Sequence, residues 1–452
     1  MLIRNSLLAG CLTLASAGLA FGAVSADKAA QLGKNLTLVG AEKAGNKEGT
    51  IPEYTGGLAT PPAGFKKGSG WRTDPFAGEK PQFSISAKNM AQYSDKLSEG
   101  VKAMLKKYPT FRLDVYKTHR TAAFPKYVTD NTVKAATTAK TSNGGLSFTG
   151  AHGGFPFPIP NDGFEAMWNH LLHYNGLTYE ERYRSYTVDS TGRPTLQTEG
   201  NVTQEYFYYD PAKPDAKDYY ALKVYFVGPA RRVGESFLLI DPLDSYNEKR
   251  KAWRYLPGQR RTKLAPELSF DTPSSIYSGQ TTWDDLFLFS GSMERYNFKI
   301  VGKKEMYIPY NEYKMIYWTN HEKDLLKANH LNPDLVRWEL HRVWVVEGTL
   351  KPGKRHLYAK RTFYLDEDSW AAALSDEYDG RGQLYRVGMN YLVQQYDVPC
   401  LFPDSFSITD LVTNSYAINA LPAPGQKGIL YPGHAFPSKD WTADSLAGQG
   451  VR

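Results

Sequence analysis

Alternating apolar and polar positions dominate the second half of the chain, from Glu199 onward. In residues 219–227 the apolar side chains fall on one side of an extended segment, at Tyr220, Leu222, Val224 and Phe226, as expected of a half-buried strand. The same period of two predicts strands over residues 236–240, 251–256, 297–301, 313–319, 336–347 and 356–365. Short turns, such as residues 351–353 and 365–369, separate several of them, so we expect neighbouring strands to pair antiparallel.

Helical spacing predicts one strong helix, over residues 163–174. Asp162 stands at its N-cap position and Glu165 at the matching capping-box position. We expect the helix to pack on the sheet through a wide apolar stripe, formed by Phe164, Met167, Trp168, Leu171 and Leu172. Weaker helical spacing predicts a short helix at residues 26–32 and two pieces within residues 86–108, broken at residues 98–100.

Glycine, proline and threonine break up the rest of the N-terminal sequence. Residues 27–85 and the loop-rich stretch that ends at Gly154 show little periodicity, and alternate prolines make residues 155–160 a stiff connector. We therefore predict an extended and partly helical region over residues 27–160 that wraps a body formed by residues 161–452. The two are expected to form one structural unit of the α+β class, rich in strands.

The first 26 residues predict export by a cleavable signal peptide. Arg4 precedes an apolar run of about 15 residues, which is short of the roughly 20 that span a bilayer. Small side chains place the cleavage site after Gly22 or Ala26. As an alternative, residues 8–11 resemble a lipobox, which would make Cys11 a lipid anchor, although the six residues between Arg4 and Cys11 are few for that arrangement.

Composition narrows the possible classes of protein. The chain has two cysteines. Removal of the signal peptide leaves Cys400 alone, so an internal disulfide is excluded. The apolar neighbours of Cys400 predict a buried, inert thiol. The net charge of +7 is mild for 452 residues and does not indicate a nucleic-acid partner. The 31 Tyr, 21 Phe and 9 Trp residues favour a sheet-rich protein.

Residues that could carry chemistry are scattered. His170 and His173 lie three positions apart on the predicted helix, but no further ligand stands at a suitable spacing, so we expect no metal site. The sequence lacks the motifs of serine hydrolases, nucleotide-binding loops, dinucleotide-binding folds and zinc proteases. We therefore predict no catalytic residues and no cofactor, while His119 and the pair Asp284 and Asp285 leave a hydrolase as a weaker alternative.

A basic run surrounds the predicted strand at residues 251–256. It comprises Lys249, Arg250 and Lys251, followed by Arg254, Arg260 and Arg261. Such a surface could bind anionic lipid headgroups or an acidic partner, or it could be the solvated outer face of a hairpin. Both interpretations stay open at the level of sequence.

Several motifs make the sequence resemble a known family. Residues 253–261 (WRYLPGQRR) and 283–286 (WDDL) resemble outer-membrane lipoprotein-sorting-like proteins. More closely, the chain resembles the family called domain of unknown function 1329, through residues 49–57 (GTIPEYTGG), 118–122 (THRTA), 153–160 (GGFPFPIP), 168–170 (WNH) and 378–383 (YDGRGQ). The resemblance implies a periplasmic protein of Gram-negative bacteria, built like the lipoprotein carriers on a curved antiparallel half-barrel with helices on its concave side. It also implies an inner-membrane exporter of the resistance-nodulation-division type and an outer-membrane protein as partners.

Together these observations favour a periplasmic binding or adaptor protein that handles lipid-like cargo. A curved sheet can shelter an acyl chain, at about 0.8 kcal/mol per buried methylene. The candidate cavity residues are Leu222, Val224 and Phe226 on the strand, with Met167, Trp168 and Leu171 on the helix, and the candidate headgroup or partner residues are Arg254, Arg260 and Arg261. A cargo-free envelope scaffold and, less favoured, an envelope lipid or glycan hydrolase are the alternatives.

Overall fold

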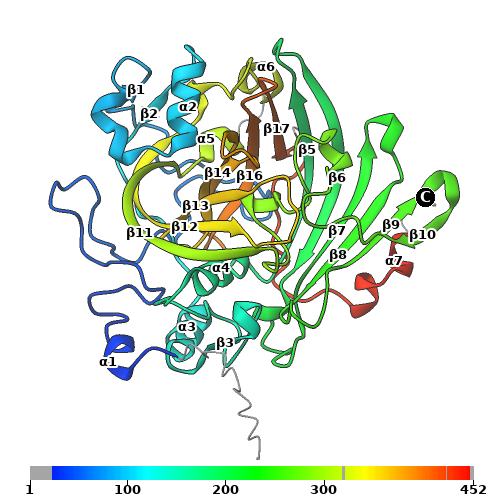
Figure 1. The fold of residues 1–452 in the computed structure, drawn as a ribbon, viewed down its shortest axis with the longest axis horizontal. Coiled ribbons are helices and arrows are strands. Elements are labelled where there is room, and N and C mark those ends of the chain that lie inside the picture. The colour runs from blue at the N-terminus through cyan, green and yellow to red at the C-terminus, as the bar shows by residue number, and fades with distance from the viewer. Residues whose placement is uncertain (1–22, 318–320, 424, 448–452) are drawn as a thin grey trace, which may run out of the picture.

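A strongly curved sheet of 15 strands organises the computed structural model (Figure 1). The structure describes residues 23–317, 321–423 and 425–447, so residues 1–22 of the predicted signal peptide, with Cys11, lie outside the described residues. No helix within the described part of the chain combines the length and the apolar character needed to cross a bilayer.

Neighbouring strands pair antiparallel, except for a single parallel contact between β2 and β12. One path through the sheet runs in the order β1 (Phe83–Ile85), β2 (Leu113–Val115), β12 (Trp338–Leu350), β13 (Lys360–Asp366), β14 (Ala372–Tyr378), β15 (Leu384–Gln395), β16 (Cys400–Asp410), β17 (Ser415–Pro422), β5 (Thr178–Val188), β6 (Pro194–Glu205), β7 (Asp218–Gly228), β8 (Ser236–Pro242), β9 (Lys251–Leu256) and β10 (Arg261–Leu264). β11 (Tyr296–Pro309) also pairs with β12, and β3 (Lys140–Ser142) and β4 (Ser147–Thr149) form a separate hairpin. Pairing of β17 with β5 joins the end of the chain to its middle.

Helices are short and lie at the faces and ends of the sheet. The α-helices are α1 (Ala26–Ala29), α2 (Glu99–Lys107), α3 (Lys126–Thr138), α4 (Gly163–Leu171), α5 (Tyr313–Ile316), α6 (His321–Leu325) and α7 (Asp444–Ala447). The 3-10 helices are η1 (Met90–Lys96), η2 (Asn143–Gly145), η3 (Phe207–Tyr209), η4 (Ala230–Arg232), η5 (Pro257–Gln259), η6 (Ser275–Tyr277), η7 (Leu286–Leu288), η8 (Pro333–Leu335) and η9 (Ser438–Trp441).

α4 is the helix predicted from residues 163–174. The Asp162 side chain accepts a hydrogen bond from the backbone N–H of Glu165 (2.9 Å). The Glu165 carboxylate accepts from the backbone N–H of Asn161 (2.6 Å). A capping box would have this carboxylate accept from Asp162, one residue later. Burial raises the pKa of Glu165 to about 7. The helix ends at Leu171, three residues before the predicted end.

Alternate residues of the strands contribute to two apolar cores, one on each face of the sheet. On β12, Trp344 and Val346 pack with α4 on the concave side, whereas Val343 and Val345 pack with the residues of α2 and α5. The predicted fold class, a curved antiparallel sheet with a helix packed in its concave face, is confirmed. Helices α2 and α5 form a second layer, which packs on the opposite face of the sheet.

Three sequence predictions need correction. The stretch that ends at Gly154 contains α3, whose buried stripe includes Thr132, Ala135 and Ala136 and is too weakly apolar to reveal a helix. Residues 313–319 were predicted as a strand, but Tyr313–Ile316 form α5. Strands β14 to β17 were not predicted, because most of their residues are buried on both faces and so lack a period of two.

Candidate functional site

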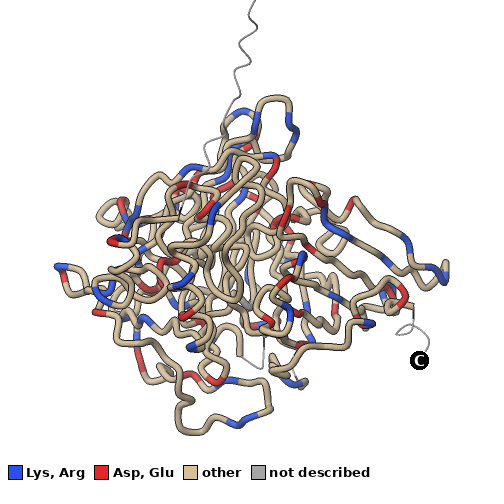
Figure 2. The backbone as a smooth tube through the Cα atoms, turned by 90° about the horizontal axis from the view of Figure 1, so that it is seen from below, with Lys and Arg blue, Asp and Glu red and all other residues tan. Residues whose placement is uncertain are grey.

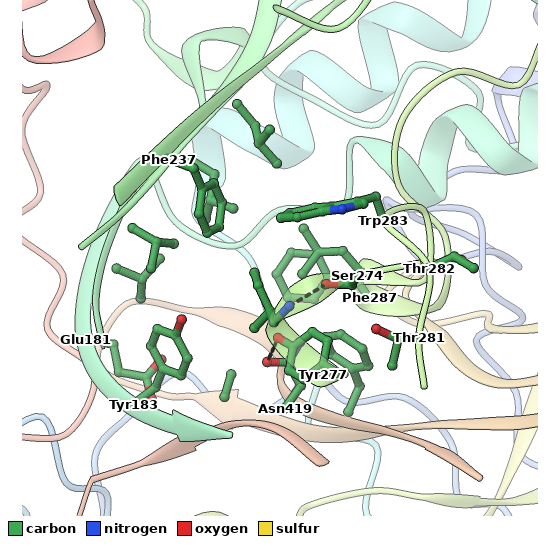
Figure 3. A pocket seen from close by; sticks show the side chains of 18 of the residues that line it. Glu181, Tyr183, Phe237, Ser274, Tyr277, Thr281, Thr282, Trp283, Phe287 and Asn419 are labelled. Atoms are coloured by element: carbon green, nitrogen blue, oxygen red, sulfur yellow. Dashed lines mark hydrogen bonds between the residues drawn. The ribbon is translucent and has the colours of Figure 1, made fainter. Parts of the chain in front are cut away.

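An apolar cavity of about 70 Å³ lies in the concave face of the sheet. Its walls come from β5 to β8 with β16 and β17 on one side, and on the other from residues 265–295, a stretch between β10 and β11 that we call the covering segment. Figure 3 shows Phe237 of the sheet and Trp283 of the covering segment bordering the same hollow. By the same measure a cavity needs roughly 10–15 Å³ to hold one water, so this one fits a small apolar group as it stands.

Strand β7 supplies the cavity with the face that the sequence predicts. Leu222 and Val224 line the hollow, while Ala221 packs in a separate apolar cluster with Trp441. Phe226 continues the inner face beyond the cavity and packs against the ring of Phe237, at 5.9 Å between centroids.

The candidate residues of α4 lie beside the cavity. Leu171 borders a separate void of about 20 Å³, together with Phe287 of the covering segment. Met167 and Trp168 are fully buried and line neither hollow. The indole N–H of Trp168 donates to the carbonyl of Gly145 (2.8 Å), so this side chain ties α4 to the preceding turn.

The middle of the covering segment, residues 274–281, forms a closed turn that we call the tip. The backbone N–H of Ser274 donates to the carbonyl of Thr281 (2.8 Å). Figure 3 shows the Tyr277 hydroxyl donating to Asn419 of β17. The remaining contacts of the tip with the sheet include the hydroxyl of Ser278, which donates to Gln197 (2.9 Å). Neutral hydrogen bonds and one charged hydrogen bond, from the Arg232 guanidinium to the carbonyl of Ser275 (2.8 Å), therefore hold this part of the cover.

The next part of the covering segment, residues 282–290, is anchored by a buried ion cluster. Arg361 of β13 donates to Asp284 (3.3 Å) and to Asp285 (3.1 Å), and His356 lies 2.9 Å from Asp284. The Arg361 Nε lies 2.8 Å from Glu377, an ion-pair distance, although its N–H is not aligned for a hydrogen bond. Burial raises the pKa of Glu377 to about 7. Burial also acts to raise the pKa of Asp284, but His356 and Arg361 hold it below its usual range.

His170 of α4 and His173, two residues beyond the end of the helix, contact the anchored part of the covering segment at Phe289 and Phe287. His170 Nδ1 accepts from the backbone N–H of Ala372 (3.1 Å), so its Nε2 carries the hydrogen that is donated to the carbonyl of Phe289 (3.0 Å). His173 uses one ring nitrogen toward the carbonyl of His170 and the other toward Asn175. Burial lowers the pKa of His170 to about 3 and that of His173 to about 4. All four ring nitrogens are engaged in hydrogen bonds, three of them with backbone groups.

Another buried cluster has the spacing of a cation site, with ligand atoms of His341, Asp366 and Asp368 within 4.8 Å of one another. Arg120 engages one of these three residues, donating to both oxygens of Asp368 (2.8 and 2.6 Å), and it also donates to the carbonyl of Glu42 (2.7 Å). The cluster therefore joins the N-terminal region to the turn after β13.

The other candidate residues, His119 and Cys400, do not line the cavity. His119 is 2.7 Å from Glu79 and stacks on Phe76, so it does not meet Asp284. Cys400 is buried, and burial raises the pKa of its thiol to about 12.

The basic run divides into two paired and two exposed arginines, and Arg250 is buried in an ion pair with Asp241 (2.7 Å). Arg254 forms an ion pair with Glu235 (2.8 Å), whereas Arg260 and Arg261 are exposed at the turn between β9 and β10.

Sequence reasoning missed the covering segment as a wall of the cavity. The available signal was its five aromatic residues within an aperiodic stretch between strands, Phe270, Tyr277, Trp283, Phe287 and Phe289. A solvated loop would not carry so many large apolar side chains.

Comparison with known proteins identifies relatives over most of the chain. Residues 84–447 match the family described as "Protein of unknown function (DUF1329)". The uncharacterized protein PA3922 of Pseudomonas aeruginosa is 41% identical over 435 residues, which cover 95% of each chain.

Two solved structures resemble the chain at low identity. A DUF1329 family protein from Desulfovibrio piger has 12% identity and a TM-score of 0.42, and the match covers 62% of this chain and 95% of that one. A LolA superfamily protein from Nitrosomonas europaea has 11% identity and a TM-score of 0.39, with 63% of this chain and 100% of that one covered.

Proposed function

The chain belongs to the DUF1329 family, and we propose that it is a periplasmic carrier that binds an apolar, lipid-like molecule without transforming it. The observation that supports this most directly is the apolar cavity between the concave sheet and the covering segment. The apolar run at residues 7–21 supports export. An exporter and an outer-membrane protein, the partners implied by the family resemblance, stay predictions.

The chemistry of the cavity wall favours binding over catalysis. Leu222, Val224 and Phe237 present hydrocarbon, and Glu181 of β5 is the carboxylate among the lining residues. Asp284 and Asp285, in the adjoining part of the covering segment, are paired with Arg361. An acyl chain that enters exchanges water for hydrocarbon, which stabilises the complex by about 0.8 kcal/mol per methylene. The polar groups at the rim, such as Asn419, can orient the polar end of such a molecule.

The size of the cavity requires the cover to move. At about 70 Å³ the hollow holds only the end of an acyl chain, so a whole chain enters when the tip shifts away from β17. The tip is held by neutral hydrogen bonds from Tyr277 and Ser278, each of which contributes about 1 kcal/mol. The hydrogen bond from the Arg232 guanidinium to the carbonyl of Ser275 adds about 1.5–3 kcal/mol. Displacement of the tip therefore requires less free energy than the burial of several methylenes releases.

A cavity-filling variant tests the proposal. Val224→Phe adds volume to the cavity wall, whereas Tyr225→Trp adds volume to the neighbouring, half-buried position on the other face of β7. We expect the wild-type protein to bind the fluorescent apolar probe 1-N-phenylnaphthylamine. Val224→Phe should bind it roughly tenfold more weakly, and Tyr225→Trp should bind it as the wild type does.

Copurified material gives a second readout. Organic extraction followed by mass spectrometry should recover an apolar molecule from the wild-type protein and less of it from Val224→Phe. If the wild type neither binds the probe nor carries an extractable apolar molecule, the carrier function is wrong, and the cargo-free scaffold becomes the better hypothesis.

A further inference from the structure

Two turns of the sheet lie side by side at one end of the molecule. The turn between β7 and β8 contains η4, and the turn between β9 and β10 contains η5. Ser236 pairs with Tyr255 at the base of both turns, and a side chain placed at Gly234 would lie 2.8 Å from Pro257. We call this pair of turns the double turn, residues 229–235 and 256–264. Figure 1 shows β9 and β10 projecting from the side of the body.

The double turn gathers positive charge without matching negative charge. Residues 249–266 contain no acidic residue, and Figure 2 shows basic positions at the end of this projection. Arg260, Arg261 and Lys263 are exposed, and within the described part of the chain no carboxylate lies at ion-pair distance from any of the three. Glu235 is engaged by Arg254 and Arg232, so it does not neutralise the surface.

Two large apolar side chains are exposed on the same two turns, and Leu264 follows Lys263 on β10 and so points to the opposite face of this edge strand. Val233 is 50% exposed and Leu264 is 72% exposed, and the rest of the apolar surface of β8 and β9 is largely buried. Exposed aliphatic side chains beside unpaired cations match the interface of an anionic bilayer, where the cations meet headgroups and the aliphatic groups enter the acyl boundary.

The double turn also touches the cover of the cavity. Arg232 lies between its exposed neighbours Arg231 and Val233, and its guanidinium donates to the carbonyl of Ser275 in the tip (2.8 Å). The same guanidinium stacks over Phe226 at 4.8 Å, and Phe226 packs on the cavity residue Phe237. A surface bound by the double turn would thus be next to the movable part of the cover.

We propose that the double turn docks the protein on an anionic lipid bilayer, with Arg231, Arg260, Arg261 and Lys263 meeting headgroups and Val233 and Leu264 entering the interface. The inference rests on the proposed carrier function, since it gives the cargo a short path between bilayer and cavity. The exposed part of the basic run is then a membrane contact. Arg254 links the two turns through its ion pair with Glu235.

Vesicle flotation tests the docking. The full chain is mixed with vesicles of phosphatidylcholine alone or of an equal mixture of phosphatidylcholine and phosphatidylglycerol, and the bound fraction is measured. Wild-type protein should float with the anionic vesicles, and added salt should release it. The triple variant R260E/R261E/K263E should partition about a hundredfold more weakly, because each basic residue contributes roughly fivefold.

A matched variant separates docking from general charge. K80E/K88E/K106E makes the same change in net charge at exposed residues that flank β1 or lie on α2, which Figure 1 shows on the far side from β9 and β10. This variant should float like the wild type. A third variant, V233S/L264S, keeps the net charge and should bind several-fold more weakly, since it removes the apolar part of the contact.

The outcomes are distinct from those of the carrier test. If the wild type does not float with anionic vesicles, or if both triple variants lose binding equally, the docking inference is wrong, and an acidic protein becomes the better partner for the surface. Binding of 1-N-phenylnaphthylamine by R260E/R261E/K263E should match the wild type. Probe binding without flotation overturns the docking alone, and flotation without probe binding overturns the carrier function alone.

Discussion

The two parts of the covering segment are held in place by different forces. The tip, residues 274–281, is held by neutral hydrogen bonds, by one hydrogen bond from Arg232 to a backbone carbonyl, and by the side chains that close the cavity, without a buried ion pair of its own among the described residues. The next part, residues 282–290, contains the buried Asp284 and Asp285, which Arg361 binds from β13. Its backbone is also strained, because Phe287 and Leu288 have φ values of 53° and 70°. Strain of this kind persists only where surrounding contacts determine the conformation.

This difference indicates which part of the cover can move. A buried ion cluster resists opening, because separation of its members leaves charges without partners in an apolar interior. Neutral hydrogen bonds at the tip can be exchanged for water at a small cost. We therefore expect residues 282–290 to stay fixed on β13 to β15 while the tip opens, and the expected effects of substitution differ accordingly.

The largest effect is expected from Arg361→Met. The substitution leaves Asp284, Asp285 and Glu377 buried without their shared cation, so it should lower the free energy of unfolding by about 3–5 kcal/mol. Arg295→Met is the matched control in the same segment, since Arg295 pairs with Asp271 (2.7 Å) at a partly exposed position.

Urea denaturation measures both variants. Arg295→Met should cost at most about 1 kcal/mol, because a solvent-screened ion pair contributes little. Equal costs for the two substitutions would show that the buried cluster is no stronger an anchor than an exposed pair, and the comparison between the two parts of the cover would fail.

A smaller effect is expected from pH, and it should be confined to the anchor. Burial lowers the pKa of His170 to about 3 from an ordinary value of 6.5. Between these pH values the unfolded chain binds a proton that the folded protein does not, so this group stabilises the fold above pH 6.5 and that stability is lost as the pH falls. Glu377, with its pKa raised to about 7, acts in the opposite direction, so variants must be compared.

Urea denaturation of His170→Gln at neutral and mildly acidic pH isolates the histidine. On acidification from about pH 6.5 to pH 5, the wild type should lose about 2 kcal/mol more of its unfolding free energy than the variant does. Tyr277→Phe in the tip should follow the wild-type profile. A pH profile of His170→Gln that is parallel to the wild type would mean that His170 titrates normally and is not a buried neutral bridge.

The sequence predicts some strands of the sheet closely and misses others, both at its edges and at its centre. β9 is predicted to the residue, because Pro257 and Gly258 end it with a turn, whereas the short edge strand β10 is not predicted. Strand β15 is buried over most of its length on both faces, so its apolar run carries no period. The pairing of β17 with β5 is a tertiary contact between distant segments, which no local pattern encodes.

The residues that line the candidate cavity also fall into some that local sequence patterns predict and others that they miss. Leu222 and Val224 are found from sequence, because one strand face determines them. Tyr277 and Trp283 line the cavity through a segment without regular structure. Its position depends on Arg361, a residue about eighty positions away in the sequence. Local patterns therefore predict the sheet side of the cavity but not its cover.

The smallest change in stability, and the sharpest test of the comparison, is expected from Tyr277→Phe. Loss of the hydroxyl removes the hydrogen bond to Asn419 and should lower the free energy of unfolding by about 1 kcal/mol. Local opening of the tip should nevertheless become easier, so its amides should exchange with deuterium faster, while the amides of Leu288 and Ser290, bonded to Asp285 and Asp284 (2.9 and 3.1 Å), should be unaffected.

Hydrogen exchange followed by mass spectrometry resolves the two parts. In the wild type, peptides from the tip should exchange before peptides from residues 282–290. Tyr358→Phe is the matched control, since it removes a hydroxyl that donates to Asp285 (3.0 Å) and should accelerate exchange only in the anchored part. If the two parts exchange together in wild type and variants, the covering segment opens as one unit. Entry of cargo would then require breaking the Arg361 cluster, and a carrier with an inexpensive opening step would no longer be tenable.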